Sequence, residues 1–544
     1  MRPGNRDERL GVLIVGAGPT GLALAVQLLV LGVRFRIIDR NLDRARESRA
    51  LAVQPRTLEL LRTPGITREL LERGNDAVAL RMHAGKRVVS VRLFETGLED
   101  TAYPFLLFVS QAETEDVLNR HLAAGGVEVE RGVELVDCTS DCEGVACTLR
   151  DRAGEIRTTR ARFLVGCDGA HSSVRDLSGI PFEGAAYPQT FALGDLDVDG
   201  DLDPDAVHAF LGPAGMLFFF PLGRPAPWRM IGMAPTGIAA GGEQAQREAS
   251  LEELQGIADA YTGGVRLRDP VWLSYFRIHH RQAAHYRSGR VFLAGDAAHV
   301  HSPAGAQGMN TGIQDSWNLG WKLALVDGGV ADKALLDTYE GERLPIGRFV
   351  LRFTDRAFSV ATSRNPLVRF LRLQVVPRLA PLLLCLRRAR AAAFRTIAQL
   401  GLDYRRSPAV EEGEPALRRG PRAGDRLPDA RIRSDSRAVW LQEALGPTGF
   451  HLLLCGEHGD WDEESPAALR ERYRGLVVVH RLTREAATGV LHDPDGTALH
   501  RLGVEGAAQY LVRPDGYIAY RCAGAETLGL ERYLARWLPR APWV

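Results

Sequence analysis

The sequence lacks the features that mark secreted, metal-binding and membrane-spanning proteins. Only seven cysteines are spread over 544 residues, and no C-x-x-C pair or Cys/His cluster has zinc spacing. The formal net charge is +1, so no strong field favours nucleic acid or an anionic membrane. No apolar run is long enough to span a bilayer, and the apolar run near the N-terminus is too short for a signal peptide. We therefore expect a cytoplasmic protein without nucleic-acid or membrane partners, and a homodimer stays open.

The length and composition indicate a folded protein of several domains. A chain of 544 residues is too long for one hydrophobic core of ordinary size, so two or three domains are expected. Hydrophobic residues make up 45% and charged residues 25%, as in ordinary globular proteins.

A glycine-rich turn follows the first apolar segment. Val12–Val15 predict a buried strand, and GAGPTG then places Gly16, Gly18 and Gly21 in G-x-G-x-x-G spacing. LALAVQLLVLG has helical periodicity, and VRFRIIDR predicts a second strand that ends in Asp39. The glycines would permit a tight turn, a close approach to a pyrophosphate and close helix packing. The pattern therefore predicts a dinucleotide site, and it fits NAD and FAD equally well. No second motif of this kind is evident that would form a separate nicotinamide domain.

Two further motifs place an aspartate directly after an apolar strand. Residues 163–175 read FLVGCDGAHSSVR, with Asp168 and Gly169 after the strand and Ser172 in position to cap a helix. Residues 291–298 read VFLAGDAA, with Asp296 after the strand. The loop HSPAGAQGMNTG then leads to a second helix, TGIQDSWNLGWKLALV, which we expect to begin near Asn310 and to pack on a sheet.

Taken together, the three motifs resemble the para-hydroxybenzoate hydroxylase family, the group A FAD-dependent aromatic monooxygenases. Their order and spacing match over roughly residues 8 to 400, and the family often has a second glycine where this chain has Ala306. The resemblance implies non-covalent FAD, with NAD(P)H and O₂ as co-substrates. It assigns cofactor binding to Gly16, Gly18, Gly21, Asp39, Arg40, Arg49, Gln111, Asp168, Gly169, Gly295, Asp296, Pro303, Gly308, Met309 and Asn310.

The resemblance also implies how each part of the site is used. Asp296 would bind the ribityl chain, and the loop containing Pro303, Gly305 and Gly308 would run along the isoalloxazine. The helix that begins near Asn310 would direct free N–H groups at the anionic edge of the reduced ring. No catalytic side chain is needed, because a flavin C4a-hydroperoxide would transfer the oxygen.

Four other carried-over positions would lie away from the ring. Arg49 would lie at the phosphate region and Gln111 beside the ribityl chain, while Asp168 and Gly169 would lie between FAD and the nicotinamide path.

The residues that contact the substrate are expected within residues 181–285. MLFFFPL and WRMIGMA predict strands of a sheet over the flavin, and packing in the core is the alternative role for each of their side chains. The candidates to face an aromatic substrate are Met216, Phe218, Phe220, Met230 and Met233.

Several other patterns suggest a further function, but a simpler structural interpretation is favoured for each. GDLDVDGDLDPD resembles a calcium loop, but the twelfth position from Asp195 is Ala206, so we expect aspartates on the solvent face of a strand. His299 and His301 flank one residue, which a loop beside the flavin explains better than a metal. Residues 367–400 are basic and amphipathic, but Pro377 and Pro381 favour packing on the flavin domain over a membrane surface. A flavin halogenase is disfavoured because no W-x-W-x-I-P segment is found.

The C-terminal part follows a change in composition. Residues 401–425 are charged and rich in Pro and Gly, which predicts a linker. FHLLLCG, GLVVVH and YLVRPDGYIAYR then predict strands and a hairpin, and they resemble the thioredoxin-like tail of phenol hydroxylase-like proteins. Cys455 and Cys522 form no C-x-x-C, so a structural or subunit-contact role is expected rather than disulfide exchange.

The sequence thus predicts an α/β protein of three domains. Residues 8–75, 105–180 and 286–400 would form a Rossmann-like (GR2-type) FAD-binding domain, and residues 76–104 and 181–285 an inserted β-sheet substrate domain. A linker at 401–425 and a thioredoxin-like domain at 426–544 would follow. The expected function is NAD(P)H-dependent hydroxylation of an aromatic or polyketide-type small molecule in secondary metabolism. A flavin reductase, an oxidase or a Baeyer–Villiger enzyme of the same fold remains an alternative, as does a non-catalytic flavin-bound ligand-binding protein.

Overall fold

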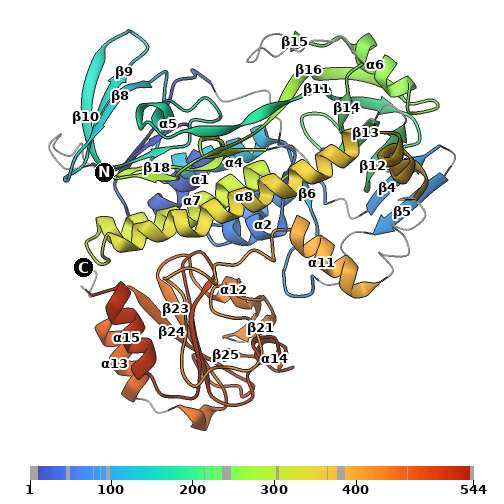
Figure 1. The fold of residues 1–544 in the computed structure, drawn as a ribbon. Helices are drawn as coiled ribbons and strands as arrows, with labels where there is room; N and C mark the ends of the chain where they lie inside the picture. Colours follow the sequence, from blue (N-terminus) through green and yellow to red (C-terminus); the bar gives the residue numbers. More distant parts are fainter. Residues whose placement is uncertain are drawn as a thin grey trace.

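Three large β-sheets with their covering helices, and one two-stranded sheet, organise the described part of the chain (Figure 1). The computed structural model describes residues 10–43, 50–76, 79–85, 87–92, 98–212, 215–235, 247–301, 305–363, 365–375, 386–435, 437–461 and 464–539. The first two sheets lie together, and the C-terminal part lies beneath them against the long helix α8 (Ala334–Thr362) (Figure 1).

The first sheet is built on buried parallel strands. Its order is β17-β18-β10-β1-β2-β7, and a hairpin of two strands pairs beside β10. The bounds are β1 (Leu10–Val15), β2 (Phe35–Asp39), β7 (Glu130–Arg131), β8 (Glu134–Ser140), β9 (Val145–Arg150), β10 (Ile156–Gly166), β17 (Arg287–Ser288) and β18 (Val291–Leu293). Strands β2, β1, β10 and β18 run parallel, so their carboxyl ends meet at one edge. Ligands of such sheets bind at that edge.

Helices cover this sheet and account for its apolar strands. Every residue of β1 is buried, because α1 (Pro19–Val30) and α7 (Gly308–Asp327) pack together on the sheet. Smaller helices surround them: α2 (Pro55–Arg62), α3 (Ile66–Arg73), α4 (Gln111–Ala124) and α5 (Ser173–Leu177). A two-stranded sheet, β3 (Ala52–Val53) with β6 (Leu107–Phe108), lies beside α2. None of the helices described is long and apolar enough to cross a membrane.

The second sheet is mainly antiparallel and has the order β15-β16-β11-β14-β13-β12-β4-β5. Its strands are β4 (Ala79–Ala84), β5 (Arg87–Arg92), β11 (Phe182–Asp199), β12 (Ala206–Gly212), β13 (Gly215–Pro221), β14 (Trp228–Met233), β15 (Arg247–Glu248) and β16 (Arg266–Ala283), with β19 (His299–Val300) paired beside β16. Helix α6 (Leu251–Asp259) covers one face, where Leu217, Phe219 and Tyr275 are buried against it. The other face packs against the two-stranded sheet of β3 and β6 and against α11 (Arg387–Ile397).

The expectation that Asp195 lies on the solvent face of its strand is wrong. Asp195 is buried in β11 and forms a two-pronged ion pair with Arg229 of β14, with both N–O distances 2.6 Å. The two residues are direct cross-strand partners, so the cation compensates the buried carboxylate.

The third sheet belongs to the C-terminal part and has the order β20-β27-β26-β23-β24-β25-β21-β22. Its bounds are β20 (Glu411–Glu412), β21 (Arg431–Ser434), β22 (Arg437–Trp440), β23 (Phe450–Cys455), β24 (Val477–Thr483), β25 (Leu491–His492), β26 (Ala508–Val512) and β27 (Ile518–Ala523). Its helices are α12 (Leu441–Ala444), α13 (Glu464–Arg472), α14 (Thr497–Leu502) and α15 (Leu528–Trp537). The segment 401–425 is not a loose tether, because β20 joins this sheet and Tyr404 is buried.

The C-terminal part docks through an apolar contact and buried charges. The ring of Trp321 on α7 meets the ring of Phe450 edge to face at 5.6 Å. Glu342 of α8 accepts hydrogen bonds from Arg513 at 2.7 and 2.9 Å and from Lys322 at 2.8 Å, with all three side chains fully buried. Burial lowers the pKa of Lys322 to about 8.

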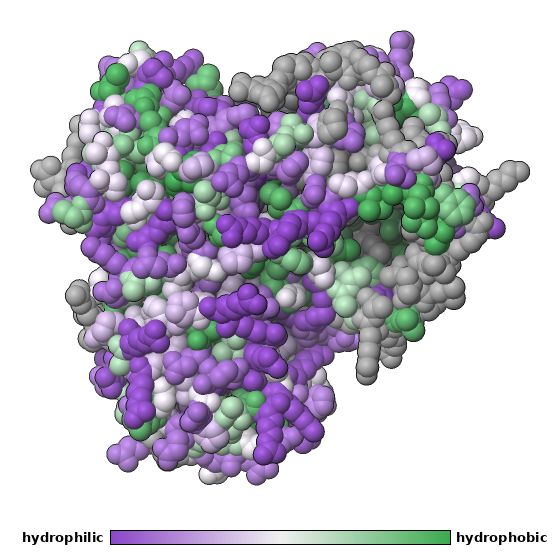
Figure 2. Space-filling view, viewed as in Figure 1, coloured by the Kyte–Doolittle hydropathy of each residue, from purple (hydrophilic) through white to green (hydrophobic). Residues whose placement is uncertain are grey.

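The basic segment after α8 partly covers the second sheet. Helices α9 (Pro366–Phe370) and α11 (Arg387–Ile397) flank residues outside the described part, which include Pro377 and Pro381. Phe394 of α11 is buried in a cluster that combines residues of this sheet with residues of β3 and β6. Leu367 and Phe370 of α9 are exposed, and Figure 2 shows apolar surface where α8 and α9 end beside the sheet.

Candidate functional site

The three glycines of the first turn have two different roles. Gly16 has φ +100°, and a Cβ there would lie 2.4 Å from the carbonyl oxygen of Cys167. A Cβ on Gly21 would lie 1.9 Å from the carbonyl oxygen of Gly16. Around Gly18, by contrast, no described atom lies within 4 Å of a built Cβ. The outer glycines are therefore required by the fold, and the middle one faces open space.

Asp39 fixes this turn from the end of β2. Its carboxylate oxygens accept the backbone N–H of Ala17 at 2.7 Å and that of Asn41 at 2.8 Å. The side chain is nearly buried, whereas the neighbouring Arg40 is exposed. Arg131 Nη1 lies 3.7 Å from Oδ2, and each carboxylate oxygen has the capacity to accept a further hydrogen bond.

The starts of α1 and α7 converge on one tight turn. Gly295 has φ +62°, and a Cβ there would lie 2.4 Å from Oγ1 of Thr20. A Cβ on Gly312 would meet the same oxygen at 2.3 Å, so a side chain at either position would force Thr20 to move. Ser316, one turn further along α7, donates to the carbonyl of Thr20 at 2.7 Å. Between the two helices the Asp296 side chain is exposed, although Gly295 and Ala297 beside it are buried.

Helix α7 begins at Gly308, two residues before the expected start. The N–H groups of Gly308, Met309 and Asn310 have no intrahelical acceptor, as in the first turn of any helix. The Asn310 side chain is fully buried and bonds to the backbone of neighbouring segments. Its Oδ1 accepts from Gln54 N–H at 2.9 Å, and its Nδ2 donates to the carbonyls of Ala52 at 2.9 Å and Ala306 at 2.8 Å.

The loop before α7 is held from several sides. Gln54 Nε2 donates to the carbonyl of Gly305 at 3.1 Å. Gln399 Nε2 donates to Oγ1 of Thr311 at 3.0 Å. Ala306 has φ +53°, a left-handed conformation that favours glycine. Pro303 and Arg49, two of the predicted cofactor residues, lie outside the described residues.

The CDGAHSSVR segment joins both turns. Ser172 caps α5 by accepting the N–H of Arg175 at 3.0 Å, as the sequence predicts. Burial raises the pKa of Asp168, although the Ser172 hydroxyl and the Val174 N–H both donate to its carboxylate. Arg175 is buried and donates to the carbonyl of Ala297 at 3.2 Å, so this segment also contacts the Gly295 turn.

The predicted ribityl contact, Gln111, stands at the start of α4. It is half-buried, and its Nε2 donates to Oε1 of Glu115 at 2.8 Å. The preceding residue, Ser110, caps the helix by accepting the N–H of Glu113 at 3.2 Å.

The structure splits the predicted substrate residues between two faces of the second sheet. Met216, Phe218 and Phe220 are half-buried on one face of β13, where the rings of Phe218 and Phe220 stack at 5.6 Å. Met230 is the cross-strand partner of Phe219, and both are fully buried on the opposite face beneath α6. Placing Met230 with the other four candidates was therefore wrong, whereas Met233 is buried in the cluster on the same side as Phe220.

The face with Phe220 lies against the loop before α7. One buried cluster combines Phe191, Phe276 and Met233 of this sheet with Phe108 of β6, and Phe220 and Ala306 pack against it. Arg229 emerges on the same face and donates to the carbonyl of Ala50 at 3.1 Å. The apolar face and the start of α7 therefore form one site.

Sequence reasoning missed Asp315 and Arg343 in this region, and it weighed His299 only as a metal ligand. Asp315 on α7, His299 on β19 and Arg343 on α8 form a fully buried ionic cluster behind the Gly295 turn. The signal available was an aspartate within the helix TGIQDSWNLGWKLALV, whose later positions are mostly apolar. A buried carboxylate of this kind requires a cation or several donors.

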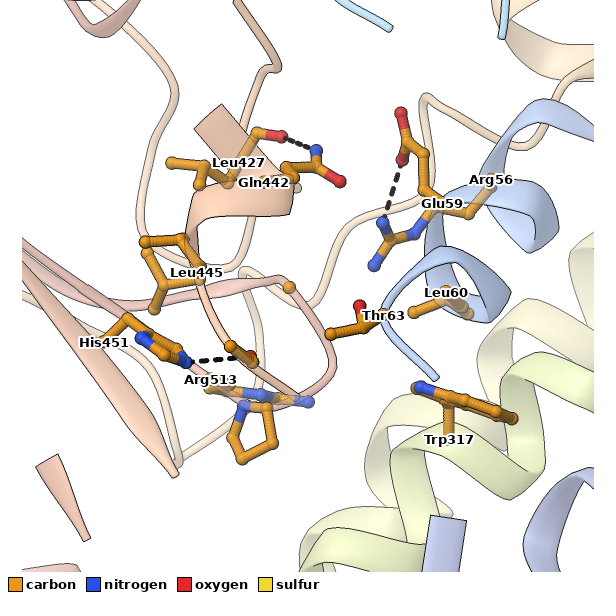
Figure 3. A pocket seen from close by; sticks show the side chains of 14 residues that line it. Arg56, Glu59, Leu60, Thr63, Trp317, Leu427, Gln442, Leu445, His451 and Arg513 are labelled. Carbon is orange, nitrogen blue, oxygen red and sulfur yellow. Dashed lines mark hydrogen bonds and ion pairs between the residues drawn. The ribbon is translucent and has the colours of Figure 1, made fainter. Parts of the chain in front are cut away.

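A small cavity lies elsewhere, between α2 and the C-terminal part (Figure 3). Arg56, Trp317, Gln442, His451 and Arg513 line it. Arg56 Nη1 donates to Glu59 at 2.9 Å, and the His451 ring contacts the carbonyl of Gly446 at 3.0 Å. The cavity is lined by polar side chains from two domains, and none of the predicted cofactor residues lines it.

Comparison with known proteins decides the family. Residues 9–354 match the family model described as an FAD binding domain, and residues 420–541 match the one described as the C-terminal domain of aromatic-ring hydroxylases. The chain belongs to the FAD-dependent aromatic-ring hydroxylases. As expected from its motifs, it is an FAD-dependent monooxygenase with an FAD-binding domain, a substrate domain and a C-terminal domain.

Relatives of this hydroxylase cover nearly its whole length. It is 37% identical over 519 residues to 6-methylpretetramide 4-monooxygenase of Streptomyces rimosus, covering 93% of this chain and 90% of the relative. The structure of anhydrotetracycline hydroxylase from the same organism superposes with a TM-score of 0.78 at 29% identity, covering 98% and 100%. Aklavinone-11 hydroxylase, solved with FAD and aklavinone, gives a TM-score of 0.78 at 26% identity with the same coverage.

Proposed function

We propose that this monooxygenase hydroxylates a fused-ring aromatic, polyketide-type small molecule, with NAD(P)H as electron donor. The observation that carries the proposal is the junction at Ala306, where the start of α7 meets the apolar face of the second sheet. A planar apolar substrate would lie against Phe218 and Phe220, next to the cofactor. The names of the relatives, which include a pretetramide, an anhydrotetracycline and an aklavinone enzyme, support a substrate of this class.

The residues present fit FAD. Gly18 leaves room for the pyrophosphate to approach the start of α1, whose N–H groups and dipole favour phosphate. Asp296 extends from the second turn toward solvent, in position to accept the ribityl hydroxyls. Asp39 retains lone pairs for the ribose, and Gln111, Arg40 and Arg49 complete the proposed set.

The start of α7 would hold the ring end of the cofactor. FAD supplies electron transfer from NAD(P)H and activation of oxygen when it is bound. The N–H groups of Gly308, Met309 and Asn310 would stabilise negative charge on the N1–C2=O edge without reorganisation. Asp168 and Gly169 would border the path of the nicotinamide. The apolar cluster around Phe220 would exclude water from the reacting atoms.

Aerobic turnover with a panel of phenols and aromatic polyketides tests the proposal. NADPH and NADH oxidation is followed with each compound, and products are analysed after turnover under ¹⁸O₂. We expect faster NAD(P)H oxidation and one labelled oxygen in the product with fused-ring compounds. Oxidation without incorporation would indicate an oxidase or reductase. Binding of a compound without oxidation would indicate a ligand-binding protein.

A further inference from the structure

A single buried carboxylate holds the Gly295 turn from behind. Asp315 on α7 has no exposed surface. Its Oδ2 accepts the backbone N–H of Gly295 at 3.0 Å and the Nε2–H of His299 at 2.7 Å. Because Gly295 and His299 lie on either side of Asp296, this carboxylate fixes both ends of the segment that presents Asp296.

Arg343 of α8 completes the cluster and reaches the start of α7. Its Nε donates to Oδ1 of Asp315 at 2.6 Å, and its Nη2 donates to the carbonyl of Thr311 at 3.1 Å. The guanidinium is fully buried. Thr311 follows Asn310 in the first turn of α7. The cation therefore lies directly behind the helix start to which the reduced flavin is assigned.

The C-terminal domain contacts the same cluster. Arg343 Nη1 donates to the hydroxyl of Tyr404 at 3.0 Å. The Tyr404 ring lies 4.2 Å from the ring of Tyr517, and the Arg513 guanidinium lies 5.0 Å from the Tyr404 ring centre. Docking of this domain thus buries the side of Arg343 that faces away from Asp315.

The two charges compensate each other at neutral pH. Burial by itself would raise the pKa of Asp315, but Arg343 and His299 hold it below its ordinary value. Arg343 stays protonated, so the pair has no net charge. Removing one partner leaves the other charge buried, where the low dielectric lets its field act over a longer distance than in water.

We propose that Asp315 and Arg343 are positioning residues that set the geometry of the Gly295–Asp296 turn and the electrical potential at the start of α7. This inference rests on the FAD placement proposed above. A buried charge near the ring changes the relative stability of oxidised and anionic reduced flavin. Because the ion pair has no net charge, it adds little to the electrical potential at the ring. The C-terminal domain shields the ion pair from solvent.

Three variants test the electrical part of this proposal. Asp315→Asn leaves an uncompensated cation, Arg343→Gln leaves an uncompensated carboxylate, and the double variant has neither. The flavin midpoint potential of each FAD-loaded protein is measured by dye equilibration. We expect a higher potential in Asp315→Asn than in Arg343→Gln, with the double variant between them and near the wild type. Equal potentials in the two single variants, or the reverse order, would overturn the proposal.

If the buried charges are needed for folding, variants that keep both charges still test the proposal. Tyr404→Phe removes only the hydroxyl that accepts from Arg343, and we expect a raised potential with an unchanged FAD stoichiometry. Tyr339→Phe is the matched control, because that buried hydroxyl on α8 donates to the carbonyl of Leu293 and not to the ion pair. Identical potentials in these two variants and the wild type would also overturn the inference. Failure of the wild type to bind FAD would instead overturn the proposed cofactor site.

Discussion

The Oδ1 of Asn310 accepts the backbone N–H of Gln54 at 2.9 Å, across 256 positions of the sequence. The same side chain donates to Ala52 and Ala306, so it joins β3, the loop before α7 and the helix start. The role of Asn310 is thus double: the backbone N–H is available to a ligand, while the side chain holds the walls of the site together.

Replacing Asn310 by Asp keeps the acceptor but removes both donors and adds a negative charge at the helix start. Two carbonyls would be left without these donors, at about 1 kcal/mol or more each. We expect the Kd for FAD, measured by fluorescence titration, to rise by at least about tenfold. Asn119→Asp is the control, since Asn119 also donates to a carbonyl but lies within α4. An equal effect of both changes would contradict this role.

Substitutions at different glycines of the first turn should affect either folding or cofactor binding. Gly18→Ala meets no described atom within 4 Å, so the apo-protein should unfold at the wild-type temperature while FAD binding is lost. Gly21→Ala would clash with the Gly16 carbonyl and should destabilise the apo-protein itself. Gly256→Ala in α6 also meets open space and should stabilise by roughly 0.5–1 kcal/mol. Normal FAD affinity in Gly18→Ala would show that the pyrophosphate lies elsewhere.

Adjacent phenylalanines of β13 should behave differently. Phe219 is fully buried under α6, so Phe219→Ala should lower the free energy of unfolding by about 3–5 kcal/mol. Phe220 packs on the face next to Ala306, so Phe220→Ala should mainly raise KM for the aromatic substrate and uncouple NAD(P)H oxidation from hydroxylation. Urea unfolding and steady-state kinetics measure the two effects. Similar KM values for Phe220→Ala and the wild type would place the substrate away from this face.

Sequence reasoning succeeded where a local pattern encodes a local geometry. The strand–turn–helix around Gly16 and the cap at Ser172 are of this kind, because turn and helix starts depend on nearby residues. MLFFFPL predicted a strand but not which side faces the cofactor, because both sides of β13 are apolar and covered. That is why Met230 was placed on the wrong face.

Long-range charge pairing could not be derived from the sequence. Asp195 looked solvent-exposed because its cation, Arg229, is 34 positions away on another strand. Asp315 and Arg343 are 28 positions apart on different helices. Only the fold brings such partners together, and a buried aspartate in an apolar helix indicates that a partner exists without saying which one.

The stability of the domain interface should depend on acidic pH. Asp100 accepts from Arg395 of α11 at 2.6 and 3.0 Å and also binds Arg426 of the C-terminal part. Burial opposes ionisation, but Arg426 and Arg395 outweigh it and lower the pKa of Asp100 from 3.8 to about 2. The folded state therefore binds this proton more weakly, and the stabilisation is present above about pH 4 and is lost as the pH falls toward 2.

Asp100→Asn should accordingly lower the free energy of unfolding by about 2 kcal/mol at pH 7 and by about half as much at pH 3. Urea unfolding of both proteins at the two pH values measures the difference. Asp141→Asn removes an exposed ion pair with Arg160 and should have no measurable effect. A difference for Asp100→Asn that grows on acidification would contradict the assigned direction.

The most direct measurement is oxygen incorporation by the FAD-loaded wild-type protein. The purified protein is incubated with NADPH, ¹⁸O₂ and the fused-ring compound that most accelerates NADPH oxidation, and the product is analysed by mass spectrometry. The account predicts one ¹⁸O atom per product molecule and a Gly18→Ala protein that forms none. Product formed without label would contradict monooxygenation, and labelled product from Gly18→Ala at the wild-type rate would contradict the cofactor site.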